Sequence, residues 1–220
     1  MSAPRATQKR VEGGSALGII TISRQIGAGE TTIAPALAER LGWKVADYSI
    51  LNREAEITGI SIPHAVHWDE HDPTFVERIH GQGPEFAAFL QTSRQVMQEL
   101  ASQGNMVIVG RGGNLLLRGR PDAIHVRLIA DMPFRLKRVM EVRWVTEEVA
   151  RLLIQKFDKN QALYYRHIFR TDCADPMHYD MVLRTDLLGI ERVVDIIANC
   201  FEDPAPLLDV AHSPYPNGRD

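Results

Sequence analysis

The sequence predicts an α/β fold built on a parallel sheet. Short apolar runs alternate with longer segments of helical periodicity along most of the chain. Several of these runs are apolar at nearly every position, as is typical of strands buried on both faces. One run is followed by a glycine-containing turn and a helical pattern, in TISRQIGAGETTIA at residues 21–34. Strands that alternate with helices favour parallel pairing, because each helix can form the crossover to the next strand.

The individual elements follow from these patterns. The strand candidates are residues 18–23, 43–47, 106–110, 123–130 and 179–185. The helix candidates are residues 31–41, 48–58, 85–103, 132–142, 146–170 and 188–201. Because Pro35 has no N–H to donate, we expect the first helix to begin a residue or two late. The spacing of apolar residues in FAAFLQTSRQVMQEL at residues 86–100 favours core packing over a partner interface.

The composition is that of one globular domain with polar tails. The chain has 220 residues, of which 45% are hydrophobic and 24% are charged. We expect a disordered tail at residues 1–15, a folded domain at residues 16–202 and a proline-rich tail at residues 203–220.

Charge, hydropathy and cysteine content argue against several classes of partner. The formal net charge is −3 without a basic block, so no nucleic-acid surface is indicated. No apolar run approaches the roughly 20 residues that span a bilayer, and the first residues have no secretory signal. Cys173 and Cys200 fit neither a metal-binding spacing nor a disulfide framework. We therefore expect a cytoplasmic protein that binds no nucleic acid and no membrane, in an oligomeric state that the sequence does not predict.

The glycine turn looks like the end of a phosphate-binding loop. Such loops follow the pattern G-x-x-x-x-G-K-[ST], in which the lysine reaches the β- and γ-phosphates. Gly29 and Thr31 match the second glycine and the hydroxyl, but Glu30 occupies the lysine position and Arg24 the position of the first glycine. A carboxylate beside a triphosphate costs on the order of 1–4 kcal/mol at effective dielectric constants of 80 to 20. Glu30 escapes this cost if it turns outward, and the helix dipole favours it there without ligand.

The context of the turn nevertheless favours anion binding. Backbone N–H groups converge where a strand leads through glycines into a helix, and the helix N-terminus adds a partial positive charge. The residues expected to bind phosphates are Gly27, Ala28, Gly29, Glu30, Thr31 and Thr32. A plain connection between a strand and a helix is the alternative.

A second anion-binding candidate follows the strand at residues 106–110. The strand leads into GRGG, so Arg111 is expected at the carboxyl end of a parallel strand. Ligands bind at that edge of open α/β sheets. A guanidinium can grip a phosphate through two parallel hydrogen bonds, although a salt bridge to a neighbouring carboxylate is the alternative.

These segments together make the chain similar to the cytidylate kinase-like family, a branch of the nucleoside monophosphate kinases. The resemblance covers roughly residues 17–201. Its most specific parts are ITISRQIGAGETTIAPALAERLG and VIVGRGGNLLLRGRPDAIHVRLIADMPFRLKRV. The segments DYSIL, DKNQALYYRHIF and YDMVLRTDLLGIERVV add to it.

The resemblance implies a fold and an activity. The fold is that of phosphate-loop NTPases, with a five-stranded parallel sheet flanked by helices, a small helical lid and an acceptor region. The activity is transfer of the γ-phosphoryl group from ATP to a nucleoside monophosphate such as CMP or dCMP, with Mg²⁺. Residues 24–32 would form the donor loop, with Thr31 as a Mg²⁺ ligand.

The resemblance also implies roles for side chains outside the loop. The acceptor region would include Asp47 and Arg111. The lid would be the helical pair at about residues 135–166, in which Arg135 and Arg138 match the arginine-rich start of the lid in related kinases. These arginines would close over the phosphates as catalytic groups.

Three residues depart from the family pattern. Glu30 replaces the lysine, although the family often lacks it and has an S-R-[QE] stretch that SRQ at residues 23–25 matches, so that Arg24 can supply the cation. Gln161 stands where related sequences tend to have arginine, and Gly112 replaces the aspartate of a G-R-D stretch. Phosphoryl transfer depends almost wholly on positioning and charge stabilisation, so missing cations slow it.

Three hypotheses therefore stand: a kinase for CMP or dCMP, a non-catalytic protein that binds a nucleotide or another anion, and a kinase for a different small acceptor. Two further features favour structural roles. His64, His67 and His71 share a helical spacing that suits a metal site, but a solvated surface is the simpler interpretation because Pro73 ends the helix. Tyr164 and Tyr165 favour packing over stacking on a base.

Overall fold

The computed structural model describes residues 18–46 and 84–202. The five strands are β1 (Ile19–Arg24), β2 (Lys44–Ala46), β3 (Met106–Val109), β4 (Ala123–Ile129) and β5 (Met181–Arg184). They form one sheet in the order β2-β3-β1-β4-β5, and each strand pairs in parallel with its neighbours. The predicted five-stranded parallel sheet is therefore confirmed.

The helices of the described region connect these strands. They are α1 (Glu30–Leu41), α4 (Pro84–Gln103), α5 (Gly113–Leu116), α6 (Met132–Arg143), α7 (Glu147–Tyr164), α8 (Thr185–Leu188) and α9 (Ile190–Glu202). A π-helical turn at Tyr165–Phe169 continues α7, and a 3₁₀ turn covers Pro176–His178. The helix predicted at residues 48–58 lies outside the described residues, as do both predicted tails. Sequence periodicity missed α5 and α8, because a single helical turn is too short to show a period.

The expectation that the first helix begins late is wrong. It begins at Glu30, directly after Gly29, which caps it in the left-handed conformation with φ 97°. Pro35 lies inside the helix. Its missing N–H removes only the hydrogen bond to the carbonyl of Thr31. Thr31 is exposed, so water can satisfy that carbonyl instead.

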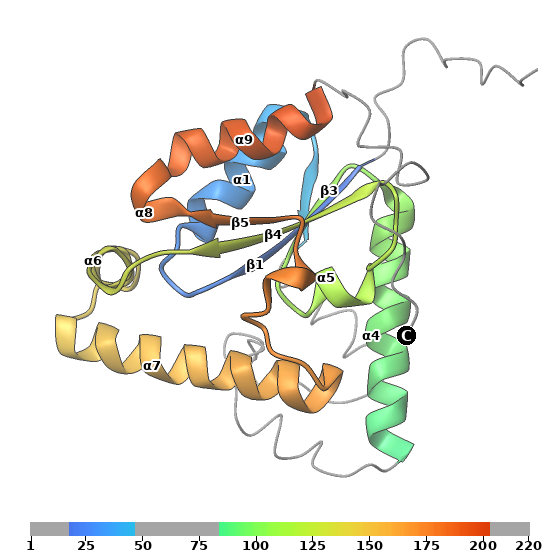
Figure 1. The fold of residues 1–220 in the computed structure, drawn as a ribbon, viewed down its shortest axis with the longest axis horizontal. Coiled ribbons are helices and arrows are strands. Elements are labelled where there is room, and N and C mark those ends of the chain that lie inside the picture. Colours follow the sequence, from blue (N-terminus) through green and yellow to red (C-terminus); the bar gives the residue numbers. More distant parts are fainter. Residues whose placement is uncertain (1–17, 47–83, 203–220) are drawn as a thin grey trace, which may run out of the picture.

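Helices pack on both faces of the sheet. Helices α1 and α9 cover one face together (Figure 1), and their apolar residues pack on Ile20, Ile22 and Val126. On the other face α4 packs Val96 and Met97 against β1 and β3. The predicted core role of the 86–100 pattern is confirmed for its described side chains.

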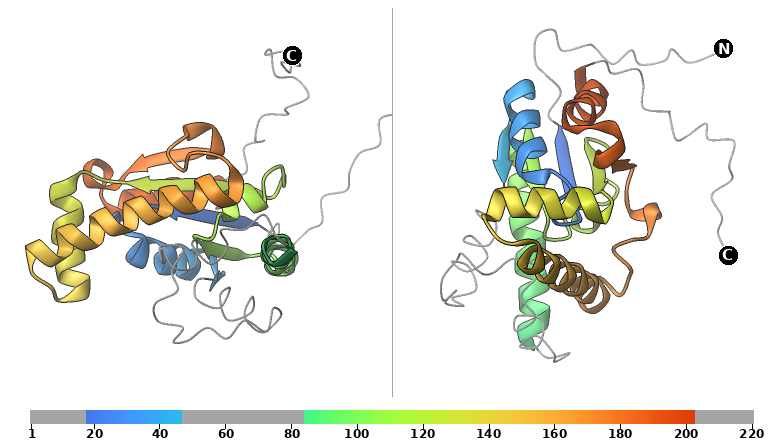
Figure 2. Two further views of the ribbon diagram at one scale, coloured as in Figure 1. Left: turned by 90° about the horizontal axis from the view of Figure 1, so that it is seen from below. Right: turned by 90° about the vertical axis from the view of Figure 1, so that its left-hand side faces the viewer.

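Helix α6 lies beyond the carboxyl end of β4, and α7 runs from there back along the sheet (Figure 1; Figure 2, left). The two helices share an apolar cluster with Ile26 of the loop between β1 and α1, including Val139, Ile154 and Phe157. The pair is therefore packed directly on the predicted phosphate loop. No helix of the described residues is long and apolar enough to cross a membrane.

Candidate functional site

The loop between β1 and α1 is anchored on β4. The N–H of Gln25 donates to the carbonyl of Leu128 at 3.0 Å, and the Gln25 side-chain oxygen accepts from the N–H of Ala130 at 3.1 Å. Within the loop, the N–H of Ala28 donates to the Gln25 carbonyl at 3.1 Å. Gln25 thus fixes the loop to β4 and the residue after it, through both its backbone and its side chain. The sequence pattern alone does not assign this role.

The loop retains backbone donors for an anion. Thr32 and Ile33 donate to the carbonyl of Gly29, as the first turn of a helix requires. The N–H groups of Gly27, Gly29 and Thr31 have no hydrogen-bond acceptor among residues 18–46 and 84–202. Together with the N-terminus of α1, these donors are suited to bind phosphate oxygens.

A pocket of about 300 Å³ lies between this loop and α6. From the loop and α1 it is lined by Ile26, Gly27, Gly29, Glu30 and Thr31, and from α6 by Arg138, Val139, Val142 and Arg143. One carboxylate and two guanidinium groups thus belong to the lining. The side chains of α6 supply the positive charge that the loop sequence lacks at its lysine position.

Arg138 connects α6 to the start of α1. Its Nη2 donates to the hydroxyl of Thr32 in the first turn of α1 at 2.7 Å. A nucleotide phosphate in the pocket would meet both the loop N–H groups and this guanidinium. Val139 and Val142 add apolar surface beside it.

Arg135 lies beside the loop but is fully engaged with protein groups. It is 3% exposed. Its Nε donates to the carbonyl of Ile26 at 2.8 Å, and its two terminal nitrogens donate to the carboxylate of Asp158 on α7 at 3.0 and 2.6 Å. This geometry fits a residue that positions the loop and the α6–α7 pair.

Gly27 shows how closely α6 approaches the loop. It has φ 78°, and a Cβ at this position would lie 2.7 Å from the Arg135 carbonyl oxygen and 3.0 Å from a Val139 methyl group. Only glycine allows this contact at that backbone conformation. Gly27 therefore allows α6 to pack closely on the loop.

Arg24 and Arg111 lie at the carboxyl ends of β1 and β3, as predicted. Both are buried, with 7% and 5% exposure. The Arg24 guanidinium carbon lies 5.6 Å from the centre of the Phe157 ring, and that of Arg111 lies 5.9 Å from the centre of the Tyr164 ring. Both rings belong to α7, so one helix contacts both predicted phosphate-binding arginines.

Gly112 is the position where the related pattern has aspartate. It has φ 67°, and a Cβ there would overlap the ring of Phe169. Phe169 packs with Tyr164 and Tyr165, at centroid distances of 5.7 and 5.6 Å. Tyr164 and Tyr165 are each 1% exposed, which confirms the prediction that they pack. The ring of Phe169 thus occupies the space that an aspartate side chain at residue 112 would need. The sequence did not predict this contact.

Some predicted site residues lie outside the described residues. These are Asp47 and the histidines His64, His67 and His71. Within residues 18–46 and 84–202, no group of three or more His, Cys, Asp or Glu side chains is arranged to hold a metal ion.

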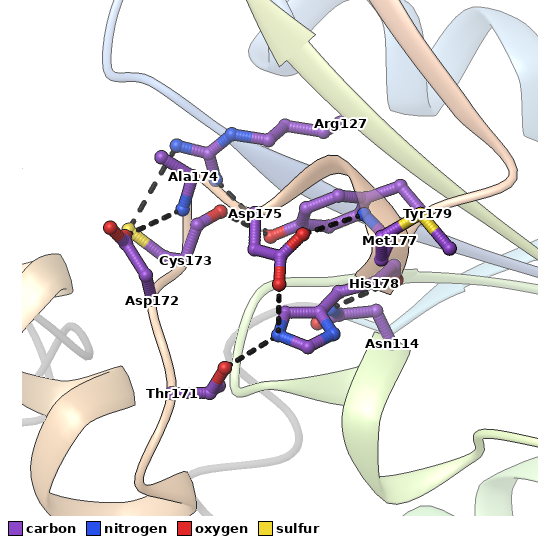
Figure 3. Close-up of polar contacts among 10 residues, drawn as sticks. All are labelled: Asn114, Arg127, Thr171, Asp172, Cys173, Ala174, Asp175, Met177, His178 and Tyr179. Atoms are coloured by element: carbon purple, nitrogen blue, oxygen red, sulfur yellow. Dashed lines mark hydrogen bonds and ion pairs between the residues drawn. The ribbon is translucent and has the colours of Figure 1, made fainter. Parts of the chain in front are cut away.

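A buried polar layer joins the sheet to the segment between α7 and β5 (Figure 3). Arg127 of β4, 5% exposed, donates from Nη1 to Ser23 Oγ at 3.0 Å and to the Tyr179 hydroxyl at 3.3 Å. Its Nη2 lies 4.0 Å from Cys173 Sγ. The Tyr179 hydroxyl donates to the Cys173 carbonyl at 2.8 Å. An arginine within the strand pattern AIHVRLIA was the available sequence signal for this layer.

His178 makes contacts within the segment between α7 and β5 and with α5. Its Nε2 lies 2.6 Å from Thr171 Oγ1 and 3.7 Å from Asp175 Oδ2 (Figure 3). Its carbonyl accepts a hydrogen bond from Asn114 at 3.4 Å. Since both contacts of the ring use one nitrogen, the three side chains do not form a relay of the kind that activates a nucleophile. Their arrangement holds the connection to β5 in place.

The comparisons with known proteins agree with this fold. A model of the cytidylate kinase-like family matches residues 19–187. The chain is 29% identical over 180 residues to a cytidylate kinase of Ignicoccus hospitalis, covering 81% of this chain and 96% of that one. It is 26% identical over 188 residues to a cytidylate kinase of Methanocaldococcus jannaschii, covering 84% and 98%. The crystal structure of an uncharacterized protein from Eubacterium ventriosum superimposes with a TM-score of 0.63 at 21% identity, covering 84% and 99%.

Proposed function

This chain belongs to the cytidylate kinase-like family of nucleoside monophosphate kinases, and on that premise we propose that it transfers the γ-phosphoryl group of ATP to CMP or dCMP. The observation that supports the proposal most strongly is the pocket between the loop and α6. There, backbone N–H donors, the N-terminus of a helix and two arginines surround one space of about 300 Å³.

The residues divide into donor and acceptor groups. Gly27, Ala28, Gly29, Glu30, Thr31 and Thr32 would form the loop around the donor phosphates. Arg138 would contact these phosphates from α6, and Arg24 would replace the missing lysine from the end of β1. Arg111 would bind the acceptor phosphate, and Asp47 would contribute to the same region.

The residues present fit a magnesium–nucleotide complex. Thr31 is exposed and lines the pocket, so its hydroxyl can ligate the metal. Mg²⁺ usually takes few protein ligands and completes its shell with water and phosphate oxygens, which suits a pocket with a single hydroxyl ligand. When bound, Mg²⁺ neutralises charge on the donor phosphates.

The α6–α7 pair would act as the lid of this site, within a domain over residues 16–202. Its contacts with the loop, through Arg135 and Arg138, support that role. Residues 1–15 and 203–220 would be tails. We further propose a cytoplasmic protein whose ligands are small nucleotides, without a nucleic-acid or membrane partner.

A non-catalytic nucleotide-binding protein is the second candidate. Glu30 brings a carboxylate into the lining of the pocket, and Gln161 brings a neutral amide to a position where related kinases tend to have a cation. Catalysis of phosphoryl transfer is mainly electrostatic, so both changes oppose it. A kinase for another small acceptor is the third candidate, favoured by the Phe169 ring at Gly112.

An ATP-turnover assay against a panel of nucleoside monophosphates distinguishes these candidates. If Arg24 replaces the lysine, Arg24→Ala abolishes turnover and Glu30→Lys changes it little. A rate on CMP or dCMP within about 1–100 s⁻¹, the ordinary range for kinases, supports the first candidate. A rate near background with intact nucleotide binding supports the second, and turnover of another acceptor supports the third.

A further inference from the structure

Glu30 is a carboxylate at the position where a phosphate loop has its lysine. It is the first residue of α1, and it lines the pocket together with its neighbour Thr31. Glu30 is half-buried, whereas Thr31 and Thr32 are exposed. Glu30 therefore belongs to the wall of the pocket rather than to the outer surface of α1.

A carboxylate in that wall has opposite effects on a nucleotide with and without a metal ion. Alone, it repels the phosphates, which carry charge of the same sign. A divalent cation between the two reverses the effect, since each anion then lies beside a positive charge. Mg²⁺ is usually bound through one or two carboxylates together with phosphate oxygens of the substrate. Glu30 and Thr31 together thus form a better set of ligands than the hydroxyl of Thr31 alone.

The positive charge of the protein comes from the opposite wall of the pocket. Arg138 and Arg143 line it from α6. Arg138 donates from Nη2 to Thr32 Oγ1 at 2.7 Å. A metal held by Glu30 and Thr31 would add positive charge on the side of the loop that lacks the lysine. An ionised carboxylate has two oxygens with about four acceptor sites, so Glu30 can ligate a metal while it keeps another contact.

We infer that Glu30 is a metal-binding residue of the donor site, which with Thr31 holds the Mg²⁺ of the bound nucleotide and makes donor binding depend on that metal. The inference rests on the proposed function and names the form of the donor, which is the magnesium complex of the nucleoside triphosphate. The metal then supplies the charge that a lysine supplies in other phosphate loops.

The test compares Glu30→Gln with a matched variant, Glu39→Gln, on the same helix. Glutamine keeps the size of glutamate and removes its charge, and Glu39 is exposed and outside the lining of the pocket. Calorimetric titration measures the Kd of a non-hydrolysable ATP analogue, once with excess Mg²⁺ and once with EDTA. Electron paramagnetic resonance measures the Kd of Mn²⁺ for the complex with the analogue. Thermal unfolding checks that both variants are folded.

The two conditions should shift the Kd of Glu30→Gln in opposite directions. With EDTA we expect the analogue to bind about 10-fold more tightly than to the wild type, because a repulsion is removed. With Mg²⁺ we expect binding about 10-fold weaker, because the metal loses a charged ligand, and Mn²⁺ binding should weaken by a similar factor. Glu39→Gln should leave all three values within about twofold of the wild type.

Any other pattern overturns the inference. Tighter binding to Glu30→Gln in both conditions shows a carboxylate that only repels the phosphates, and unchanged binding shows one that is turned away from them. Weaker binding in both conditions, or the same response from Glu39→Gln, shows an effect that does not depend on the metal.

Binding and turnover separate this inference from the proposed function. A protein without turnover in which Glu30→Gln gives the opposite shifts refutes only the kinase proposal. An active kinase in which these shifts are absent refutes only this inference. A wild type that binds the analogue in neither condition refutes both.

Discussion

Arg135 of α6 and Asp158 of α7 form a two-bond ion pair, and the Nε of Arg135 donates to the carbonyl of Ile26 in the loop. One side chain thus connects both helices of the α6–α7 pair to the residue that precedes Gly27. Movement of the pair away from the loop has to break these bonds.

Removing one partner of the Arg135–Asp158 ion pair should destabilise the protein more than removing both. Asp158→Ala leaves the buried guanidinium of Arg135 without its carboxylate and should cost about 1–3 kcal/mol. This is less than the roughly 3–5 kcal/mol of fully buried pairs, because the Asp158 side chain is 38% exposed and water screens it. The double variant Arg135→Met/Asp158→Ala should be more stable than Asp158→Ala. Urea unfolding measures both.

The exposed pair of Glu147 and Arg151 on α7 provides the control for this experiment. Its side chains are 62% and 47% exposed, so Glu147→Ala should cost no more than about 0.5 kcal/mol. Equal losses for Asp158→Ala and Glu147→Ala would contradict a positioning role for Arg135.

Arg111 should contribute to acceptor binding more than to stability. Arg111→Met keeps an apolar stem against the Tyr164 ring and removes the charge. We expect the affinity for CMP to fall by about 1.5–3 kcal/mol, the usual contribution of a hydrogen bond to a charged group. Titration calorimetry measures the affinity and thermal unfolding the stability. A large loss of stability at unchanged affinity would show that Arg111 is a structural residue.

Restoring aspartate at residue 112 should fail for a steric reason. The Phe169 ring occupies the space that a Cβ at Gly112 would need, so Gly112→Asp should destabilise the protein by about 1–3 kcal/mol, as overpacking does, without improving CMP binding. Gly112→Asp should therefore lower the stability less in the Phe169→Ala background than in the wild type. Denaturant unfolding of both single variants and of the double variant tests this coupling. Additive losses would show that the ring does not limit residue 112.

Stability should fall as the pH falls below about 6.5 because of His125. Burial lowers the pKa of His125, against the opposing effect of Asp180 and with a small contribution from Arg118. The unfolded chain therefore binds a proton at a higher pH than the folded protein does. The stabilisation is complete above the unfolded pKa and is lost as the pH falls from there through the folded pKa.

Urea unfolding between pH 5 and pH 7.5 measures this dependence. His125→Gln should show a smaller decline over that range than the wild type. Since both proteins retain the other histidines, the difference between their slopes isolates His125. Identical slopes would mean that His125 titrates alike in both states.

The fold was predictable from local patterns, and the details of the site were only partly so. The apolar strands and the longer amphipathic helices are local features, so the sequence predicts all five strands and the longer helices of the described region, but not the single turns α5 and α8. Partners far apart in sequence are different. The contacts of Arg127 with Ser23 and of Thr21 with His125 each span 104 residues, and the local sequence does not identify the partner in either case. Phe169 lies against Gly112 for the same reason.

In the site, too, local features were predictable and contacts between distant residues were not. The loop position and the location of Arg24 and Arg111 follow from strand ends, which sequence patterns locate. The engagement of Arg135 with Asp158, and the pairing of Arg138 with Thr32, depend on how α6 packs. Residue type alone could not separate a positioning arginine from one that faces the pocket.

The packing of α1 against α9 has a consequence for biosynthesis. The buried apolar residues of α1 include Ile33 and Leu37. They belong to the same hydrophobic cluster as Val193 and Ile197 of α9. The helix that follows the phosphate loop is thus covered by the last helix of the described region. A growing chain cannot bury this surface until α9 has been synthesised, so the earlier part remains exposed to chaperones and proteases until then. Burial of the α1 surface is therefore expected to wait for α9, and loss of α9 should leave an insoluble chain even though every residue of the loop is present.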